Sequence, residues 1–339
     1  MDHYNTGATQ DVDNQSELPF VSIILPVRNE EKFIANCLNA VLQQQYPPEK
    51  MEILVADGCS SDRTVEIIRQ TAGATRVTVL ENRKQKQACG INILIQHAKG
   101  DIIIRVDGHT IIAQNYIYSC VQALRESGAD MVGGAIAPQG VTSIGEAIAC
   151  AAKTPFAVPG AFHTAAAAQF TDTVYMGAWK REAITKTGLF NETLRANEDY
   201  EYNYRLRKNG GKIYFSPAIT SVYYNRQSFG ALFRQYFTYG RGKCAMLRQN
   251  PTSLRIRQLI APLFTLWLLP GIFILFLGNI FSLIWLGVTA LYIFLALFFA
   301  FRAIPRDQPL LIFPAALAFP VMHISWGAGF WRGWLDNIS

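Results

Sequence analysis

Acidic residues at three places in the chain have the chemistry of one group-transfer reaction. Asp57 and Asp107 each follow an apolar run directly, and Glu198 and Asp199 stand together in a later polar stretch. Asp57 could accept a hydrogen bond from the N–H of a nucleotide base. Asp107 and His109 offer an oxygen and an imidazole to one divalent cation, and imidazole suits Mn²⁺ better than Mg²⁺. Such a cation would stabilise a departing diphosphate, while Asp199 could deprotonate an acceptor hydroxyl as a general base.

Each of these residues by itself also fits a plainer explanation. Asp57 and Asp107 are each followed by glycine, and an Asp-Gly pair after a strand is typical of a turn. His109 alone fits an ordinary loop histidine. Glu198 and Asp199 fit the start of a helix, where acidic side chains interact favourably with the helix dipole. Their order along one framework of strands and helices favours the chemical interpretation.

The first third of the chain predicts strands that alternate with helices. We expect strands over residues 21–25, 51–56, 77–80 and 101–106, and helices over residues 31–45, 62–71 and 86–98. This alternation predicts βαβ units and a mainly parallel sheet with both faces covered. Ligands of such sheets bind at the carboxyl ends of the strands, which is where Pro26, Asp57 and Asp107 stand.

Beyond residue 114 the pattern is less regular. We expect further strands over residues 131–135 and 173–179 and a helix over residues 197–208. Residues 229–248 predict an amphipathic helix in which aromatic side chains stand beside Arg234 and Arg241. Such a helix either lies in a membrane interface or packs against a core.

Apolar runs near the end of the chain predict membrane spans. Residues 259–277 and 280–301 are each close to the roughly 20 residues that a helix needs to cross a bilayer. Residues 310–330 could form a third span, although Pro314 and Pro320 weaken it. Basic residues before the first run and after the second predict that the preceding domain faces the cytoplasm.

The composition agrees with a globular domain followed by a membrane region. Half of the 339 residues are apolar and only 17% are charged, which is a low share for a soluble enzyme. The net charge of +6 is local, since eleven Lys and Arg but no Asp or Glu lie between Arg205 and Arg257. This stretch ends where the apolar runs begin, which favours a membrane flank over a nucleic-acid surface. Six dispersed cysteines form neither a zinc pattern nor a disulfide framework.

Four stretches resemble the ordered motifs of family 2 glycosyltransferases over roughly residues 19–245. They read VSIILPVRNEEKFIANCLNAVLQQQYP, ILVADGCSSDRT, GDIIIRVDGHT and RANEDYEYNYRLRKNGGKI. The resemblance implies the GT-A fold, a Rossmann-like, mostly parallel α/β sheet. It also implies a nucleotide-sugar donor, Mg²⁺ or Mn²⁺, and inversion of the anomeric centre. The RVDGH form and the membrane tail are similar to succinoglycan-type glucosyltransferases of bacterial exopolysaccharide biosynthesis.

The resemblance gives donor-binding roles to individual residues. Pro26, Arg28 and Glu30 would line the nucleotide pocket. Asp57 would recognise the base, and Lys86 would approach the base or the diphosphate.

The resemblance also gives roles to the residues nearest the chemistry. Asp107 and His109 occupy the D-x-D motif of the family, with histidine in place of the second aspartate. Both would hold the metal, and the exchange leaves Mg²⁺ and Mn²⁺ open. Asp199 matches the catalytic base, with Glu198 as its competitor.

We therefore expect an inverting transfer of a single sugar to an undecaprenyl-diphosphate-linked oligosaccharide, with UDP-glucose or another UDP-sugar as the donor. Single transfer is favoured because residues 234–241 lack the tryptophan of the Q-x-x-R-W motif that processive members carry. One alternative is a polyprenyl-phosphate sugar transferase, whose acceptor phosphate needs no base. Another is a non-catalytic nucleotide-binding membrane scaffold. Nucleic acid is not an expected partner, whereas polysaccharide-assembly proteins are.

The expected organisation has four parts. Residues 1–18 form a flexible N-terminal segment, 19–227 a catalytic domain, 228–257 a basic amphipathic juxtamembrane segment, and 258–339 a transmembrane region of two to three helices. The expected location is a bacterial inner membrane, with the catalytic domain facing the cytoplasm.

Overall fold

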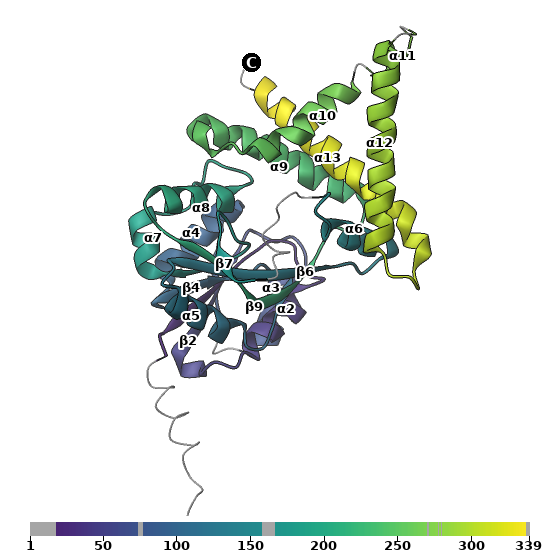
Figure 1. Ribbon diagram of the computed structural model, residues 1–339. Helices are drawn as coiled ribbons and strands as arrows, with labels where there is room; N and C mark the ends of the chain where they lie inside the picture. The colour runs from purple at the N-terminus through teal and green to yellow at the C-terminus, as the bar shows by residue number, and fades with distance from the viewer. Residues whose placement is uncertain are drawn as a thin grey trace, which may run out of the picture. The chain divides into compact units, whose positions relative to one another are not determined.

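A computed structural model describes residues 18–73, 77–157, 167–269, 271–276, 278 and 280–336 (Figure 1). The N-terminal segment predicted to be flexible lies outside these residues, apart from Leu18. The chain divides into two compact units whose segments interleave along the sequence. The first unit holds Met1–Ala135, Ala165–Glu192 and Tyr202–Ser221, and the second holds Ile136–Thr164, Thr193–Glu201 and Val222–Ser339.

Four parallel strands form one half of the sheet in the first unit. They are β1 (Val21–Val27), β2 (Met51–Asp57), β3 (Val77–Glu81) and β4 (Ile102–Arg105). All β1 residues are buried, as the continuous apolar run of a strand covered on both faces requires. β1 pairs with β2 and with β4, and β2 pairs with β3, all in parallel. The predicted parallel order is thereby confirmed for these strands.

Further strands complete a mixed sheet. They are β5 (Thr110–Ile112), β6 (Met131–Gln139), β7 (Gln169–Phe170), β8 (Ala178–Lys180) and β9 (Ile213–Tyr224). The pairs β4–β8, β6–β8 and β7–β9 are antiparallel. The strand order is β3-β2-β1-β4-β8-β6-β9-β5, with β7 paired to β9. The sequence did not predict β5, β7 or β9, because these strands are short or carry polar residues among the apolar ones.

The strand predicted over residues 173–179 is wrong in its first part. β8 begins only at Ala178, after two residues with positive φ, 56° at Met176 and 111° at Gly177. These left-handed conformations are incompatible with an extended strand. A φ of 111° at position 177 would strain any residue other than glycine, and a side-chain carbon there would also lie 3.0 Å from a ring carbon of Trp179.

Helices cover both faces of the parallel strands. Those of the first unit are α2 (Ile34–Leu42), α3 (Thr64–Ala72), α4 (Gln87–His97), α5 (Tyr116–Ser127) and α7 (Arg181–Thr187); α8 (Glu198–Lys208) begins in the second unit. The odd-numbered residues of β1 share a core with α2 and α5. On the other face, α4 packs closely on β1 and β2. A side-chain carbon on Gly90 of α4 would stand 3.5 Å from Cβ of Pro26 and 3.6 Å from Cβ of Ala56. The helices therefore hold the strand ends rigidly.

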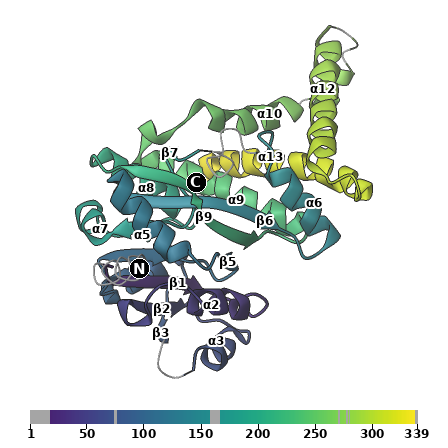
Figure 2. The same ribbon diagram turned by 60° about the horizontal axis from the view of Figure 1, so that its bottom comes forward.

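The second unit is mainly helical (Figure 2). Its helices are α6 (Ser143–Ala152), α9 (Phe229–Gln249), α10 (Ile260–Leu268), α11 (Gly271–Leu275), α12 (Ile280–Ala303) and α13 (Ile312–Leu335). Short 3₁₀ turns occur at Pro48–Lys50 in the first unit and at Pro251–Ser253, Ile256–Leu259 and Pro309–Leu311 in the second. α9 and α13 cross closely, because a side-chain carbon on Gly240 would stand 2.0 Å from the Trp326 carbonyl oxygen.

Two helices, Ile280–Ala303 and Pro309–Leu335, are long and apolar enough to cross a membrane. Residues 259–277 do not form the single span that we predicted, since α10 ends at Leu268 and α11 begins at Gly271. The sequence has Pro270 at this point, and a proline has no N–H for the helical hydrogen-bond ladder. The third predicted run, by contrast, lies within one long helix.

Candidate active site

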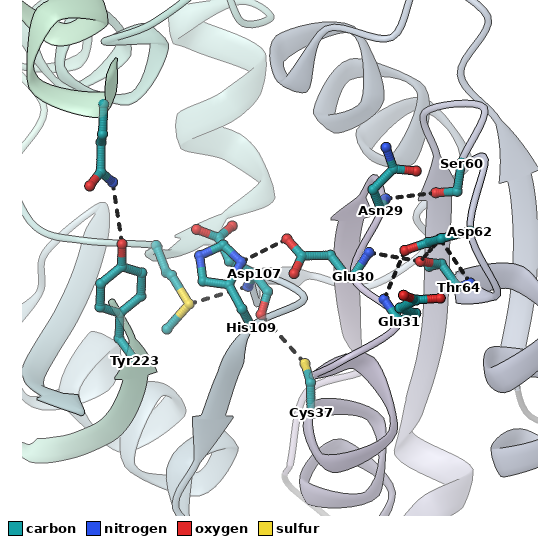
Figure 3. A network of polar contacts seen from close by, with 12 residues as sticks. Asn29, Glu30, Glu31, Cys37, Ser60, Asp62, Thr64, Asp107, His109 and Tyr223 are labelled. Carbon is teal, nitrogen blue, oxygen red and sulfur yellow. Dashed lines mark hydrogen bonds and ion pairs between the residues drawn. The ribbon is translucent and has the colours of Figure 1, made fainter. Parts of the chain in front are cut away.

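The loops after β1 and β2 are joined by side chains that bond to backbone (Figure 3). The Asn29 N–H donates to the Ser60 hydroxyl at 2.9 Å, and the Glu30 N–H donates to the Thr64 hydroxyl at 2.7 Å. Asp62 in turn accepts from the Thr64 hydroxyl at 2.5 Å. This network fixes the loop that carries the candidate residues Arg28 and Glu30.

Asp57 lies at the end of β2 and is buried. Its carboxylate accepts from the Ser60 hydroxyl at 2.5 Å and from the Ser60 N–H at 3.1 Å. A side-chain carbon on Gly58 would stand 3.2 Å from Cβ of Arg28. The glycine therefore leaves space for the Arg28 side chain. Arg28 and Asp57 thus lie together at the ends of neighbouring strands, beside Pro26 within β1.

Asp107 is 5% exposed and lies beyond the end of β4. Arg105, 3% exposed, donates from Nε to Oδ1 at 2.7 Å and from Nη2 to Oδ2 at 3.2 Å, and the Tyr175 hydroxyl donates to Oδ2 at 2.9 Å. Burial by itself would raise the pKa of Asp107, but the charges of Arg105 and His109 and the hydrogen bonds from Arg105 and Tyr175 hold it below the ordinary value. Asp107 is therefore an anion at neutral pH.

His109 is paired with Glu30, with 2.8 Å between Nδ1 and Oε1 (Figure 3). A carboxylate can only accept, so Nδ1 carries the proton. Gly108 makes the approach possible, since a side-chain carbon there would stand 3.1 Å from Cγ of Glu30. A carboxylate that orients an imidazole in this way is the usual support of a metal-binding histidine.

The donor atoms fit a divalent cation that is held in large part by its diphosphate ligand. No group of three or more His, Cys, Asp or Glu side chains suited to a metal occurs among the described residues. Asp107 already uses three of the roughly four acceptor positions of a carboxylate. Asp107 and His109 could thus supply at most one oxygen and one imidazole, and phosphate oxygens and water would supply the rest, as is common for such ions.

Lys86 is engaged elsewhere in the structure. Its ammonium group donates to the Glu192 carbonyl at 2.9 Å, while the Glu192 side chain accepts from Lys84 at 2.6 Å and from Asn92 at 3.1 Å. The hydrogen bonds from Lys84 and Asn92 lower the pKa of Glu192 to about 2. These contacts join the start of α4 to the chain near residue 192, and a role for Lys86 at the nucleotide stays a prediction.

Glu198 and Asp199 belong to the second unit and form the first turn of α8. The Asp199 carboxylate accepts from the Tyr200 N–H at 2.7 Å, whereas Glu198 is buried. Asn197, with φ of 62°, donates from its side chain to the Tyr239 carbonyl at 2.8 Å. The start of α8 is therefore anchored on α9.

Sequence reasoning missed three residues that shape the first unit's site: Arg105, Tyr175 and Glu192. The sequence does mark Arg105 as unusual, because it is the one charged residue in the apolar run IIIRV that precedes Asp107. No sequence feature marks Tyr175 or Glu192, since each contacts residues that lie far away along the chain.

The chain matches the family described as Glycosyl transferase family 2 over residues 22–143, and the Glycosyl transferase family group 2 over residues 102–301. It is 30% identical to the succinoglycan biosynthesis protein ExoA of Rhizobium meliloti over 93% of this chain and 94% of that protein. It is 29% identical to a dolichyl N-acetyl-alpha-D-glucosaminyl phosphate 3-beta-D-2,3-diacetamido-2,3-dideoxy-beta-D-glucuronosyltransferase of Methanococcus voltae, over 94% of this chain and 98% of the relative.

A solved structure agrees on the fold. A mannosyltransferase from Pyrobaculum calidifontis, solved in complex with GDP-Man and Mn²⁺, superposes with a TM-score of 0.60 at 19% identity, over 95% of this chain and 89% of that one. The fold is thus GT-A-like, a mixed α/β sheet followed by apolar C-terminal helices. The chain belongs to the family 2 glycosyltransferases and is a glycosyltransferase, which sets aside the non-catalytic scaffold.

Proposed function

We propose that this enzyme transfers a single glucose from UDP-glucose to a sugar hydroxyl of an undecaprenyl-diphosphate-linked oligosaccharide, with inversion, at the cytoplasmic face of a bacterial inner membrane. The observation that supports it most strongly is the pair of oriented groups beyond β4. Asp107 is buried and charged between Arg105 and Tyr175, and Glu30 orients His109 at 2.8 Å. These groups lie at the strand ends where ligands of such sheets bind.

The donor would be bound by the first unit. Asp57 would accept from the base, and Arg28, beside it, would place a positive charge near the phosphates. Asp107 and His109 would hold the divalent cation, which when bound neutralises charge on the leaving diphosphate. Imidazole as a ligand favours Mn²⁺ over Mg²⁺.

The acceptor would be activated by Asp199. The carboxylate takes the proton of the acceptor hydroxyl, the oxygen forms a bond to the anomeric carbon, and the bond from that carbon to UDP breaks on the opposite side. Attack opposite to the leaving group inverts the anomeric centre. Glu198 is the alternative base. It is buried, whereas Asp199 is half-buried and thus more accessible to an acceptor.

The membrane helices and the relatives support a lipid-linked acceptor. Two C-terminal helices are apolar and long enough to enter a bilayer. The Methanococcus voltae relative carries the name of a transferase for a dolichyl phosphate-linked sugar, and ExoA is named for succinoglycan biosynthesis. A saccharide on a lipid carrier fits both names, and its hydroxyl needs a base.

A transfer assay with the full chain in membranes tests the proposal. Labelled UDP-, GDP- and dTDP-sugars are offered with a lipid-linked oligosaccharide or with bare polyprenyl phosphate. We expect label from UDP-glucose on the oligosaccharide only, and loss of transfer in Asp107→Asn. Label on bare polyprenyl phosphate would instead establish the alternative transferase, and transfer from another nucleotide sugar would correct the donor.

A further inference from the structure

A groove of about 500 Å³ opens in the second unit between the C-terminal end of α6 and that of α12. Its apolar walls include Pro155, Phe298 and Phe299, and its charged side chains are Lys153 and Arg302. α6 and this end of α12 lie side by side in both views (Figures 1 and 2). The groove thus combines two cations with an aromatic surface.

The wall after α6 is held firmly in place. The Phe156 ring stacks on Phe299 with 5.2 Å between centroids, and the Thr154 hydroxyl donates to the Ala151 carbonyl at 2.8 Å. His323 of α13 lies 3.0 Å from the Phe156 carbonyl oxygen through Nε2. Because a carbonyl only accepts, His323 donates here. The groove is therefore a built feature rather than a gap between loose segments.

The two cations of the groove are not engaged in ion pairs among the described residues. Both Lys153 and Arg302 are exposed. The Glu146 carboxylate accepts from the Gly140 N–H at 3.2 Å through Oε2, and its Oε1 lies 3.8 Å from Sγ of Cys150 in the groove wall. The side chains that line the groove carry two positive charges, against one carboxylate behind the wall, and they suit an anion.

The groove lies at the boundary of an apolar helix. Arg302 is the penultimate residue of α12, whereas Phe298 lies one turn earlier and is 43% exposed. In a helix that crosses a bilayer, a terminal Arg lies at the depth of the lipid phosphates and the preceding turn lies against hydrocarbon. Positive charge and apolar surface therefore occur in the order in which a phospholipid presents its phosphate and its chains.

We propose that this groove binds an anionic glycerophospholipid, with its phosphate between Lys153 and Arg302 and an acyl chain along Phe298 and Phe299. Free phosphate would leave the aromatic walls uncovered. A saccharide is disfavoured because no Asp, Glu, Asn or Gln side chain lines the groove. None of the residues that line the groove is one of the proposed sugar-transfer residues, so the proposal adds a bound lipid to the enzyme.

Native mass spectrometry of the full chain, released from nanodiscs of phosphatidylcholine with a minor share of phosphatidylglycerol, tests the site. The wild type should retain phosphatidylglycerol. Lys153→Gln and Arg302→Gln should each lower that retention about fivefold, as expected from the interaction of one interfacial cation with an anionic lipid. Ala303→Trp, which fills the groove without changing charge, should lower it as well.

Arg306→Gln is the matched control, because Arg306 has the same charge, follows α12 and does not line the groove. It should retain phosphatidylglycerol like the wild type. Equal loss in Arg306→Gln, or full retention in the groove variants, would overturn the proposal. Displacement of phosphatidylglycerol by polyprenyl phosphate at equal concentration would also overturn it. The groove would then be assigned to binding of the acceptor lipid. None of these readouts depends on sugar transfer.

Discussion

The carboxylates of Asp107 and Glu30 in the first unit have different partners, and we infer different roles for them. Asp107 is buried against Arg105 and Tyr175, which keep it charged in an apolar setting. Glu30 is paired with an imidazole and acts on the orientation of His109. We infer that Asp107 contributes a negative charge to the donor site, and that Glu30 fixes the orientation of the His109 imidazole.

Exchanging His109 should change the metal preference of donor binding. His109→Asp restores the D-x-D pattern of the family, and an all-oxygen site favours Mg²⁺ relative to Mn²⁺. His109→Ala should weaken UDP binding with Mn²⁺ by about tenfold or more, in the range seen when a metal site loses a supporting group. Calorimetric titration of UDP with each metal measures both effects. His97→Ala, on the exposed end of α4, is the control, and equal weakening there would contradict the assignment.

The residues of this site differ in how far the sequence could predict them. Asp57 ends β2, and Asp107 and His109 lie just beyond the end of β4, so the strand pattern alone places them at one edge of the sheet. The Glu30 and His109 contact needs the loop geometry that Asn29, with φ of 55°, and Gly108 allow. Lys86 was assigned by motif, but its bond to the Glu192 carbonyl depends on a segment far along the chain.

At the scale of elements, the contacts of Glu192 join α4 to the chain that precedes α8. Its carboxyl has a pKa of about 2, lowered by the hydrogen bonds from Lys84 and Asn92. A carboxyl with a depressed pKa stabilises the fold above its unfolded pKa, and this contribution is lost as the pH falls through the folded value. The relevant window extends from about pH 4.5 down to about pH 2.

Glu192→Gln should therefore make the protein less sensitive to acid in this window. The thermal midpoint of the wild type should fall between pH 4.5 and the acid limit of the experiment, and that of Glu192→Gln should fall less. The exposed ion pair is screened by solvent, so the difference should be small. Glu182→Gln, on exposed α7, serves as the reference. Identical acid profiles for the wild type and Glu192→Gln would show that this cluster does not stabilise the fold.

The crossing of α9 and α13 depends on glycine. A side-chain carbon on Gly240 would meet the Trp326 carbonyl oxygen at 2.0 Å, whereas one on Gly287 of α12 would meet nothing within 4 Å. Gly240→Ala should thus destabilise by about 1–3 kcal/mol, as overpacking of a close contact does. Gly287→Ala should be neutral or slightly stabilising, because alanine favours helix. Thermal unfolding in one detergent compares them, and equal midpoints would refute the close crossing.

At the scale of the whole molecule, the pattern of apolar residues in the sequence predicted the parallel strands and the apolar helices better than the segments between them. β1, β2 and β4 are short and mainly apolar, and α12 has no charged residue before Arg302, so composition alone defines them. β9 was missed because its twelve residues include Ser216, Pro217 and Thr220, and only pairing across the sheet holds them extended. Residues 259–277 match one span in composition, but the sequence carries Pro270 between α10 and α11, and hydropathy alone does not register such a helix-breaking residue.

Membrane association should be a property of the intact chain. α12 has an apolar surface that is mostly exposed in the structure, and such a surface needs lipid or detergent cover. We expect the full-length protein to stay with membranes in high salt and in alkaline carbonate, and to be released by detergent. Release by salt alone would mean that the basic stretch, and not the apolar helices, attaches the protein to the membrane.

Substitution of the proposed base tests the account most directly. Asp199→Asn should lower single-turnover transfer to the lipid-linked oligosaccharide by at least about a hundredfold, the usual contribution of a general base, while UDP binding with Mn²⁺ stays within about twofold of the wild type. Glu198→Gln should keep most of the transfer rate if it folds with an unchanged thermal midpoint. Full transfer by Asp199→Asn, with or without loss in Glu198→Gln, would contradict the assignment.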